Sequence, residues 1–268
     1  MLKTKHLFAL LLTLAMIFSF VGCGQATMPN NGDKTPPNDT SATDHFTGST
    51  ESPDLDTSTD ESHASYSPFG SVQVGDVIFF GRYEQDDNTE NGPEEIPWIV
   101  LDSTGLDIFV ISAQIIEYRR YDRYDKENPD RDYTHTDWEQ CWLRGWLNKN
   151  FYEEAFTGAE RNIINLSEVE NVHQITETTF REFTTQDYIF LLSLDELEQY
   201  FPSYDDKMSM ATDYVFAKAD GSSEGASSWW LRTVIGTYIS MVQPSGVPNG
   251  HSVANYFGVR PAMWLHIG

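Results

Sequence analysis

The stretch W-E-Q-C-W-L-R-G-W-L-N, from Trp138 to Asn148, decides the fold. Its three tryptophans stand at 138, 142 and 146, a spacing that places side chains on one face of an α-helix. We therefore expect a helix here whose tryptophan face is buried.

Helix starts are indicated by pairs of a hydroxyl residue and a glutamate three positions later, the pattern of a capping box. The pairs are Thr136 with Glu139, Thr157 with Glu160, and Ser193 with Glu196. The last pair predicts a helix over Leu194 to Phe201 that Pro202 ends, and the apolar run Tyr188 to Leu192 before it predicts a buried strand. The middle of the chain is therefore expected to be mainly helical.

β-rich runs lie on both sides of this middle. Before it come Val72 to Tyr83 and Ile96 to Val110, and the turn formers of Gln85 to Pro93 between them predict a hairpin. After it come the expected strands Trp229 to Arg232, Tyr238 to Val242, and Val259 to His266. Strands, then helices, then strands predict an α+β fold, with antiparallel strands and a few short helices in one globular domain over 66–268.

The chain begins with the features of a bacterial lipoprotein. A short basic region precedes the apolar run Leu7 to Phe20, which has the length of a signal-peptide core rather than of a membrane-spanning helix. The following Phe20-Val21-Gly22-Cys23 resembles a lipobox, so we expect a signal peptide over 1–22 and a lipid on Cys23. The alternative is an ordinary secretory peptide that is cut elsewhere.

Residues 23–65 carry too little apolar surface to offset the entropy of ordering. We expect a disordered acidic linker between the lipid and the domain. The protein is then held on the extracellular face of the cell membrane through its N-terminal lipid only.

The acidic composition limits the partners of the chain. The net charge is −24, from 17 Lys and Arg against 41 Asp and Glu, which disfavours nucleic acid because phosphates need cationic surface. From Gly225 to Gly268 there is no acid, and the only Lys or Arg residues are Arg232 and Arg260. Since both lie in apolar strands, we expect both to pair with carboxylates from the preceding part of the domain.

The catalytic signals are weak. Gly221 to Gly225 matches the G-x-S-x-G elbow of serine hydrolases, but a strand is expected after it and no acid follows to complete a triad, so a Gly/Ser loop is favoured. Cys141 lies on the tryptophan face and is expected to be a small buried hydrophobe rather than a nucleophile. We predict that the protein is not an enzyme.

The metal-binding signals are also weak. Two acidic stretches could hold calcium, namely Asp86 to Glu95 and the group Asp122, Asp125, Asp130 and Asp132. In the first, Asp87-x-Thr89-x-Asn91-Gly92 imitates the start of a calcium loop, but Trp98 stands where the closing Glu is needed. A solvated turn is favoured, and we predict neither a metal ion nor a cofactor.

Five blocks together resemble a family of bacterial exported proteins and lipoproteins that carries the domain of unknown function 6273. They are G-D-V-I-F-F-G-R-Y-E-Q (Gly75 to Gln85), I-P-W-I-V-L (Ile96 to Leu101), the tryptophan stretch, W-W-L-R (Trp229 to Arg232) and G-V-R-P-A-M-W-L (Gly258 to Leu265). The chain departs from the family pattern at Thr233-Val234-Ile235, where a Gly-containing turn is common.

The closing W-x-L-R and G-x-R-P-A blocks also resemble, more remotely, C-type-lectin-like domains of the formylglycine-generating-enzyme type. That enzyme group works with cysteine and copper chemistry at a paired site, and this chain has only Cys141, so the resemblance carries no activity. It implies a scaffold that displays a ligand-binding loop between its last strands.

We therefore expect a cell-surface lipoprotein whose domain binds a wall glycan, a peptide or a surface protein without catalysis. The alternatives are an extracellular hydrolase with an unrecognised carboxylate pair and a purely structural envelope protein. Two carboxylates that share a concave pocket, one of them with a raised pKa, would favour the hydrolase.

The ligand surface is expected between Ile235 and Phe257, because this segment combines tyrosines and amides with turns between two expected core strands. The candidate ligand-binding residues are Tyr238, Ser240, Gln243, Asn249, His251, Asn255 and Tyr256. The alternative is a plain β-hairpin with a polar outer face. All seven tryptophans lie in the domain, and any exposed one offers a platform for sugars.

Overall fold

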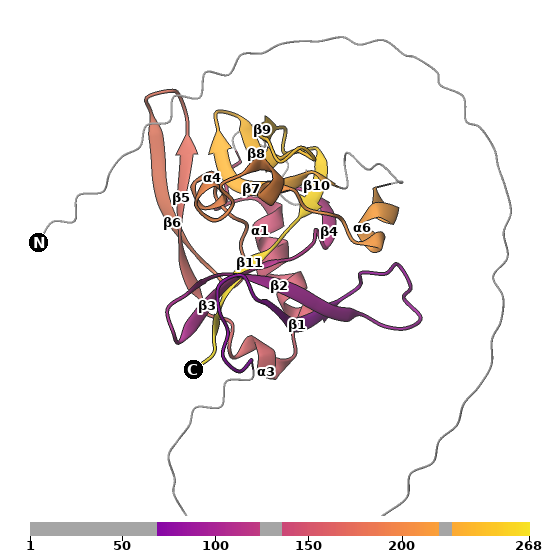
Figure 1. Ribbon diagram of the computed structural model, residues 1–268. Coiled ribbons are helices and arrows are strands. Elements are labelled where there is room, and N and C mark those ends of the chain that lie inside the picture. The colour runs from indigo at the N-terminus through magenta and orange to yellow at the C-terminus, as the bar shows by residue number, and fades with distance from the viewer. Residues whose placement is uncertain (1–68, 124–135, 220–226) are drawn as a thin grey trace, which may run out of the picture. The chain divides into compact units, whose positions relative to one another are not determined.

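The computed structural model describes residues 69–123, 136–219 and 227–268 (Figure 1). These residues form two β-sheets and a set of short helices, so the predicted α+β class is confirmed. Several predicted features lie outside the described residues: the signal peptide over 1–22, Cys23, the linker over 23–65, Gly221 to Gly225, and Asp125, Asp130 and Asp132.

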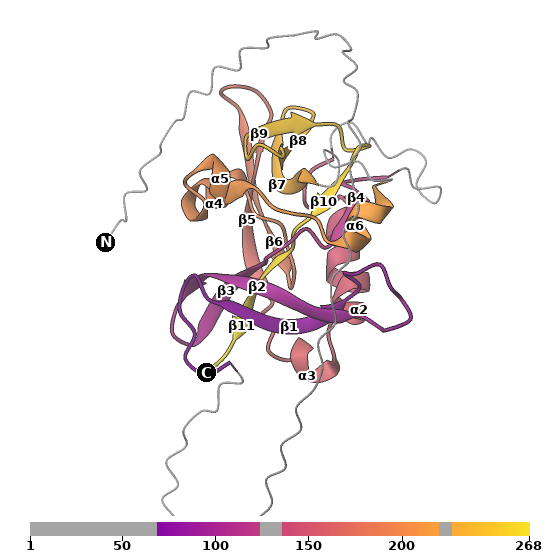
Figure 2. The same cartoon turned by 45° about the vertical axis from the view of Figure 1, so that its right-hand side comes forward.

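The first sheet is entirely antiparallel and contains the start and the end of the domain. Its strands are β1 (Val77–Tyr83), β2 (Glu94–Ser103), β3 (Asp107–Ser112) and β11 (Ala262–His266), in the order β1-β2-β3-β11. β1 and β2 form the predicted hairpin. β11 pairs with β3, with Trp264 opposite Phe109, so the last strand of the chain completes this sheet (Figure 2).

The second sheet has seven strands and is organised around β7. Its strands are β4 (Glu117–Arg120), β5 (Ser167–Gln174), β6 (Phe180–Asp187), β7 (Trp229–Ile235), β8 (Tyr238–Val242), β9 (Pro248–His251) and β10 (Tyr256–Val259). The pairing order is β4-β10-β7-β5-β6, while β8 pairs with β7 and β9 pairs with β8. β10 pairs in parallel with the start of β7, and β5 pairs in parallel with its end. In the middle of β7, the Arg232 N–H donates to the Leu192 carbonyl at 2.9 Å.

The helices are all short. They are α1 (Trp142–Trp146), the π-helical turn η2 (Leu147–Phe151), α2 (Tyr152–Ala155), α3 (Gly158–Arg161), α4 (Leu194–Tyr200), α5 (Tyr204–Lys207) and α6 (Asp213–Lys218). The predicted capping boxes of Thr157 with Glu160 and of Ser193 with Glu196 are confirmed. Among the described residues, no helix is long and apolar enough to cross a bilayer.

The predicted helix start at Thr136 is wrong. α1 begins at Trp142, and its N-cap is Cys141, whose Sγ accepts a hydrogen bond from the Arg144 N–H at 3.3 Å. Trp138 therefore precedes the helix, although its side chain is fully buried as expected. A sulfur cap is an unusual substitute for the oxygen caps on which the prediction depended.

Two predicted strands also differ from the structure. Tyr188 to Leu192 is buried from Ile189 onward but makes only an isolated bridge, between Phe190 and Ala262. The run Val259 to His266 is divided at Arg260 and Pro261 into β10 and β11, because proline has no N–H for a continuous ladder. At this break the chain passes from the second sheet to the first (Figure 2).

Buried tryptophans hold the core together. Trp98, Trp138, Trp146, Trp229 and Trp230 are buried. Four of their indole N–H groups donate to protein acceptors: Trp98 to the Phe80 carbonyl (2.7 Å), Trp138 to Asp187 Oδ2 (3.0 Å), Trp229 to the Lys207 carbonyl (3.1 Å) and Trp230 to the Arg119 carbonyl (2.8 Å). Each of these four side chains buries apolar surface while its indole N–H keeps a hydrogen bond. The tryptophan-rich blocks therefore specify the fold, and only Trp142 and Trp264 are partly exposed.

Candidate functional site

An open hollow of about 410 Å³ lies beside Trp264. Its lining residues are Thr104, Asp107, Asn165, Leu166, Ser167 and Trp264. They come from the turn before β3, the start of β3, the segment that leads into β5, and β11. The hollow is shallow and largely open to solvent, and its lining combines apolar and polar groups.

Aromatic stacking fixes the indole of Trp264. Its ring stacks on the buried Phe109 ring, with centroids 5.0 Å apart and planes inclined by 24°. Phe109 in turn stacks on Phe190 at 5.7 Å. Because this column is packed in the core, the exposed part of the Trp264 ring is held in one orientation at the hollow.

Asp107 supplies the charged wall of the hollow. Its Oδ1 accepts a hydrogen bond from Asn165 Nδ2 at 2.9 Å and lies 2.9 Å from His266 Nδ1. The hydrogen bond from Asn165, followed by that from His266, lowers the pKa of Asp107. Both contacts use Oδ1, so among the described residues Oδ2 has no protein donor and can accept from a ligand.

Asn165 is positioned by its own backbone. Its N–H donates to the Trp264 carbonyl at 2.9 Å, which attaches this segment to β11. The amide and the carboxylate are therefore fixed relative to the indole. A flat aromatic surface beside paired hydrogen-bonding groups is suited to a sugar, whose C–H face can stack while its hydroxyls donate and accept.

The hollow was not predicted from the sequence. Asp107 and Asn165 lie in segments without a motif, and Trp264 lies in a block that is otherwise core. The one available signal was that Trp264 stands next to Met263 and Leu265, which alternation places on the other face of the strand.

The residues of the predicted ligand surface between Ile235 and Phe257 differ in how far they are exposed. Tyr238, Asn249 and Tyr256 are exposed, Gln243, His251 and Asn255 are partly exposed, and Ser240 is buried. Ser240 therefore does not belong to an exposed surface, because both faces of β8 from Ile239 to Val242 are covered.

The remaining residues of that segment point to different faces. His251 pairs with Ile239, so the two share one face of the β8–β9 hairpin, while Tyr238 lies on the other face against Gly250. His251 also contacts the Phe257 ring edge-on at 5.0 Å. Tyr256 is next to Phe257 in β10 and therefore points away from His251. The structure does not bring the seven predicted residues into one site.

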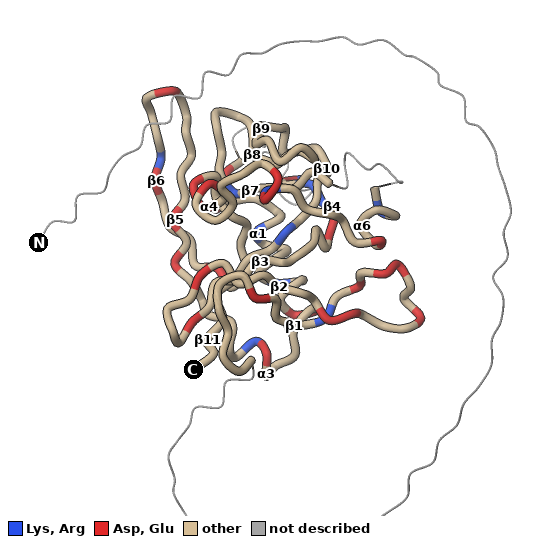
Figure 3. The backbone as a smooth tube through the Cα atoms, in the orientation of Figure 1, with Lys and Arg blue, Asp and Glu red and all other residues tan. Residues whose placement is uncertain are grey.

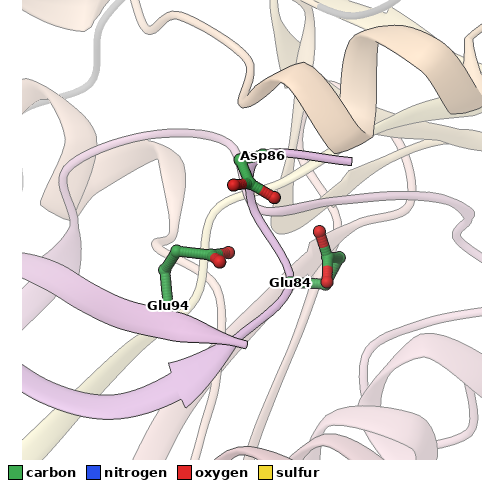
Figure 4. A group of neighbouring side chains, drawn as sticks. All are labelled: Glu84, Asp86 and Glu94. Carbon is green, nitrogen blue, oxygen red and sulfur yellow. The ribbon is translucent and has the colours of Figure 1, made fainter. Parts of the chain in front are cut away.

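The acidic loop between β1 and β2 brings three carboxylates together (Figure 4). They belong to Glu84, Asp86 and Glu94, and one oxygen of each lies within 4.8 Å of the others. Burial raises the pKa of Glu84, while a hydrogen bond from Asn91 lowers that of Asp86. The group is on an exposed turn. Asp86 and Glu94 belong to the acidic stretch Asp86 to Glu95 considered from the sequence, whereas Glu84 precedes it and Asp87, the first position of the calcium-like motif, is not in the cluster.

Cys141 is buried, as expected. Its burial raises the pKa of the thiol to about 12. The thiolate required for nucleophilic chemistry is therefore disfavoured at neutral pH.

The two arginines of the acid-free segment differ. Arg232 pairs with Glu196, as predicted. Arg260 does not pair with a carboxylate among the described residues, and that prediction is wrong. Its Nε donates to the Ser112 carbonyl at 2.8 Å, its guanidinium lies over the rings of Phe201 and Trp229, and its Nη1 is buried without a partner.

Comparison with known proteins gives one match. The family model described as Domain of unknown function (DUF6273) matches residues 107–267, which is more than half of the chain and includes Asp107, Asn165 and Trp264 of the hollow. Searches of curated proteins and of solved structures found no match. The chain belongs to the family of the domain of unknown function DUF6273.

Proposed function

We propose that this protein is a cell-surface lipoprotein, anchored through Cys23, whose domain binds a glycan of the envelope without catalysis. The hollow beside Trp264 is the observation that supports ligand binding most strongly. The lipobox at Phe20 to Cys23 supports the anchor, and the acidic linker over 23–65 supports a domain held away from the membrane. The remote resemblance to lectin-like domains agrees with a ligand-displaying scaffold.

The chemistry of the hollow favours an uncharged sugar. Trp264 offers an apolar face and Asp107 Oδ2 an acceptor. The hydroxyl of Ser167 offers a second acceptor, since it donates its own hydrogen to the Asn165 carbonyl at 3.3 Å. An anionic sugar would meet the charged Asp107 carboxylate, whose lowered pKa keeps it ionised at neutral pH. We therefore propose that neutral hexose units, rather than acidic ones, occupy this site.

A binding role is favoured over a hydrolytic one by the state of the carboxylates. Among the described residues that line the hollow, Asp107 alone carries a carboxylate, and its pKa is lowered, whereas a general acid needs a raised pKa. The pair with divergent pKa values, Glu84 and Asp86, lies on an exposed turn. Glycoside hydrolysis requires two carboxyl groups across one sugar ring, whereas the described lining of the hollow supplies one.

The test is a binding screen of the purified chain against an array of neutral and acidic envelope glycans, followed by titration of the best neutral ligand. Trp264→Leu should weaken that binding several-fold, up to about ten-fold, since an aromatic stacking contact contributes on the order of 0.5–1.5 kcal/mol. Phe180→Leu alters an exposed aromatic on β6 and is the matched control, which should bind like the original chain. The double variant Tyr238→Ala and His251→Ala tests the surface expected from sequence. Loss of binding in that variant, with Trp264→Leu unaffected, would move the site to the β8–β9 hairpin.

A further inference from the structure

An exposed leucine, Leu166, forms part of the lining of the hollow beside Trp264. Its side chain is open to solvent, with 53% of the residue surface accessible. In the proposed function, the C–H face of a sugar ring is matched by the indole of Trp264. Leu166 is a second apolar surface, which hydroxyl groups do not match. It therefore indicates that the ligand carries a small apolar group besides its sugar ring.

The backbone on both sides of Leu166 is fixed. Before it, the Asn165 N–H donates to the Trp264 carbonyl at 2.9 Å. After it, Ser167 begins β5 opposite Asp187, and its hydroxyl donates to the Asn165 carbonyl at 3.3 Å. The leucine is therefore held at a defined place relative to the indole, as a residue that determines specificity must be.

The charged group of the hollow is an acceptor. Asp107 Oδ1 holds Asn165 and His266, whereas Oδ2 has no protein donor among the described residues. The acidic residues of the chain gather elsewhere, for example on the loop between β1 and β2 (Figure 3), and the described lining of the hollow holds one carboxylate and no Lys or Arg. The hollow therefore offers an anionic oxygen to an N–H or O–H donor and no cation to an anionic ligand.

An N-acetyl group matches the leucine and the carboxylate at the same time. A secondary amide is planar and trans, so its N–H and its acetyl methyl lie along one edge while the carbonyl faces the opposite way. Along that edge, the N–H can donate to Asp107 Oδ2 while the methyl contacts Leu166. The carbonyl then faces water, which the open side of the hollow allows. A hydroxyl on the same ring carbon supplies a donor but no methyl.

We propose that the hollow selects an N-acetylated amino sugar, with its ring on Trp264, its amide N–H on Asp107 Oδ2 and its methyl on Leu166. This inference rests on the proposed function, because the sugar occupies the same hollow. It narrows the neutral hexoses to those that carry an acetamido group. Trp264 contributes to the binding of any sugar ring, whereas Leu166 determines the preference for the acetylated one.

The experiment titrates the purified full chain, in a non-ionic detergent without a sugar headgroup, with β-linked trimers of N-acetylglucosamine, glucose and glucosamine. These trimers share ring and linkage and differ in one substituent, which is an acetamido, hydroxyl or ammonium group. Leu166→Ser removes the apolar contact. Leu106→Ser is the matched control, because Leu106 is exposed to a similar extent, 59%, and does not line the hollow. Calorimetry measures each Kd, and circular dichroism verifies that the variants are folded.

We expect the acetylated trimer to bind the original chain about ten-fold more tightly than the glucose trimer, since it adds a charge-assisted N–H bond and a methyl contact. Leu166→Ser should reduce this preference about four-fold, the effect of one methyl group that loses its apolar contact. Its affinity for the glucose trimer should stay within about two-fold of the original value, because glucose has no group against the leucine. Leu106→Ser should keep the full preference.

Equal affinity for the acetylated and glucose trimers, with both weakened by Trp264→Leu, overturns this inference and leaves the proposed function standing. The inference is also overturned if Leu166→Ser and Leu106→Ser change the preference equally, or if the glucosamine trimer or an N-acetylated dipeptide binds more tightly than the acetylated trimer. Absence of binding by every neutral glycan of the array, in contrast, overturns both the inference and the proposed function.

Discussion

The guanidinium of Arg232 meets the carboxylate of Glu196 in a two-point ion pair, with Nη2 2.8 Å from Oε1 and Nη1 in contact with Oε2. Arg232 is almost fully buried, whereas 28% of the Glu196 side chain is exposed. Glu196 also accepts from the Ser193 N–H at 2.8 Å as part of the capping box of α4. One carboxylate thus connects the start of a helix to the central strand β7.

The unequal burial of this pair predicts unequal effects of mutation. Glu196→Ala should lower the free energy of unfolding by about 3–5 kcal/mol, because it leaves a buried charge without its partner. Arg232→Met should cost less, since it removes the buried charge and leaves a carboxylate that solvent reaches. Urea denaturation measures both, with Glu182→Ala on the exposed face of β6 as the control. Equal losses in the two variants would contradict this explanation.

Replacing Arg260 by an apolar residue of similar volume should affect the free energy of unfolding in the opposite direction from breaking the Arg232–Glu196 pair. Burial lowers the pKa of Arg260 to about 10, and no described carboxylate compensates its charge. Arg260→Met keeps most of the volume and should raise the free energy of unfolding by about 1–4 kcal/mol. Arg260→Ala should lower it because a cavity replaces the side chain. A lower melting temperature for Arg260→Met would instead mean that the charge itself is needed.

Asp107 should make the stability of the domain depend on pH in the acidic range. Its folded pKa is lowered from the ordinary value of 3.8, so the folded state binds a proton less readily than the unfolded state. The stabilisation is therefore present above about pH 4 and is lost as the pH falls through the folded pKa. Unfolding free energies of the original chain and of Asp107→Asn should differ by a constant amount above this range and converge below it. A difference that persists unchanged at low pH would exclude the carboxylate as its source.

Cys141 should resist alkylation until the domain unfolds. Its pKa of about 12 leaves very little thiolate at pH 8, and the side chain is buried. In a Cys23→Ala chain, where Cys141 is the remaining thiol, iodoacetamide should label the native protein far more slowly than the urea-unfolded protein. Similar rates in both states would show that Cys141 is accessible.

Membrane attachment should depend on one residue. Cys23→Ala should release the protein from membrane pellets and abolish labelling by a fatty-acid analogue, because the thioether-linked lipid cannot form. Ser52→Ala in the linker is a control that should remain in the pellet. Continued lipid labelling of Cys23→Ala would place the attachment at another residue.

Periodicity and turn chemistry were sufficient to predict the β1–β2 hairpin, β8, α4 and two capping boxes. These local signals failed where contacts between residues distant in sequence determine the structure of a segment. Cys141 caps α1 with sulfur. Ile189 to Leu192 is buried without forming a strand, and the Leu192 carbonyl accepts the Arg232 N–H of β7. Such choices depend on neighbours that are distant in sequence.

The candidate sites were harder to predict than the fold. The hollow joins Asp107 to Asn165, which are separated by 58 positions. This pair has no characteristic spacing in the sequence. The segment chosen from composition, Ile235 to Phe257, contains both Tyr256 and His251, but alternation along β10 separates the two.

The place of β11 in the first sheet has a consequence for the order of folding. Met263 and Leu265 are fully buried, and their strand pairs with β3, which was synthesised about 150 residues earlier. The first sheet cannot be completed before β11 has left the ribosome, so we expect its closure to follow the synthesis of the whole second sheet. A nascent chain whose first sheet stays open until β11 is available should remain competent for passage through a narrow translocation channel, which export of the proposed lipoprotein would need.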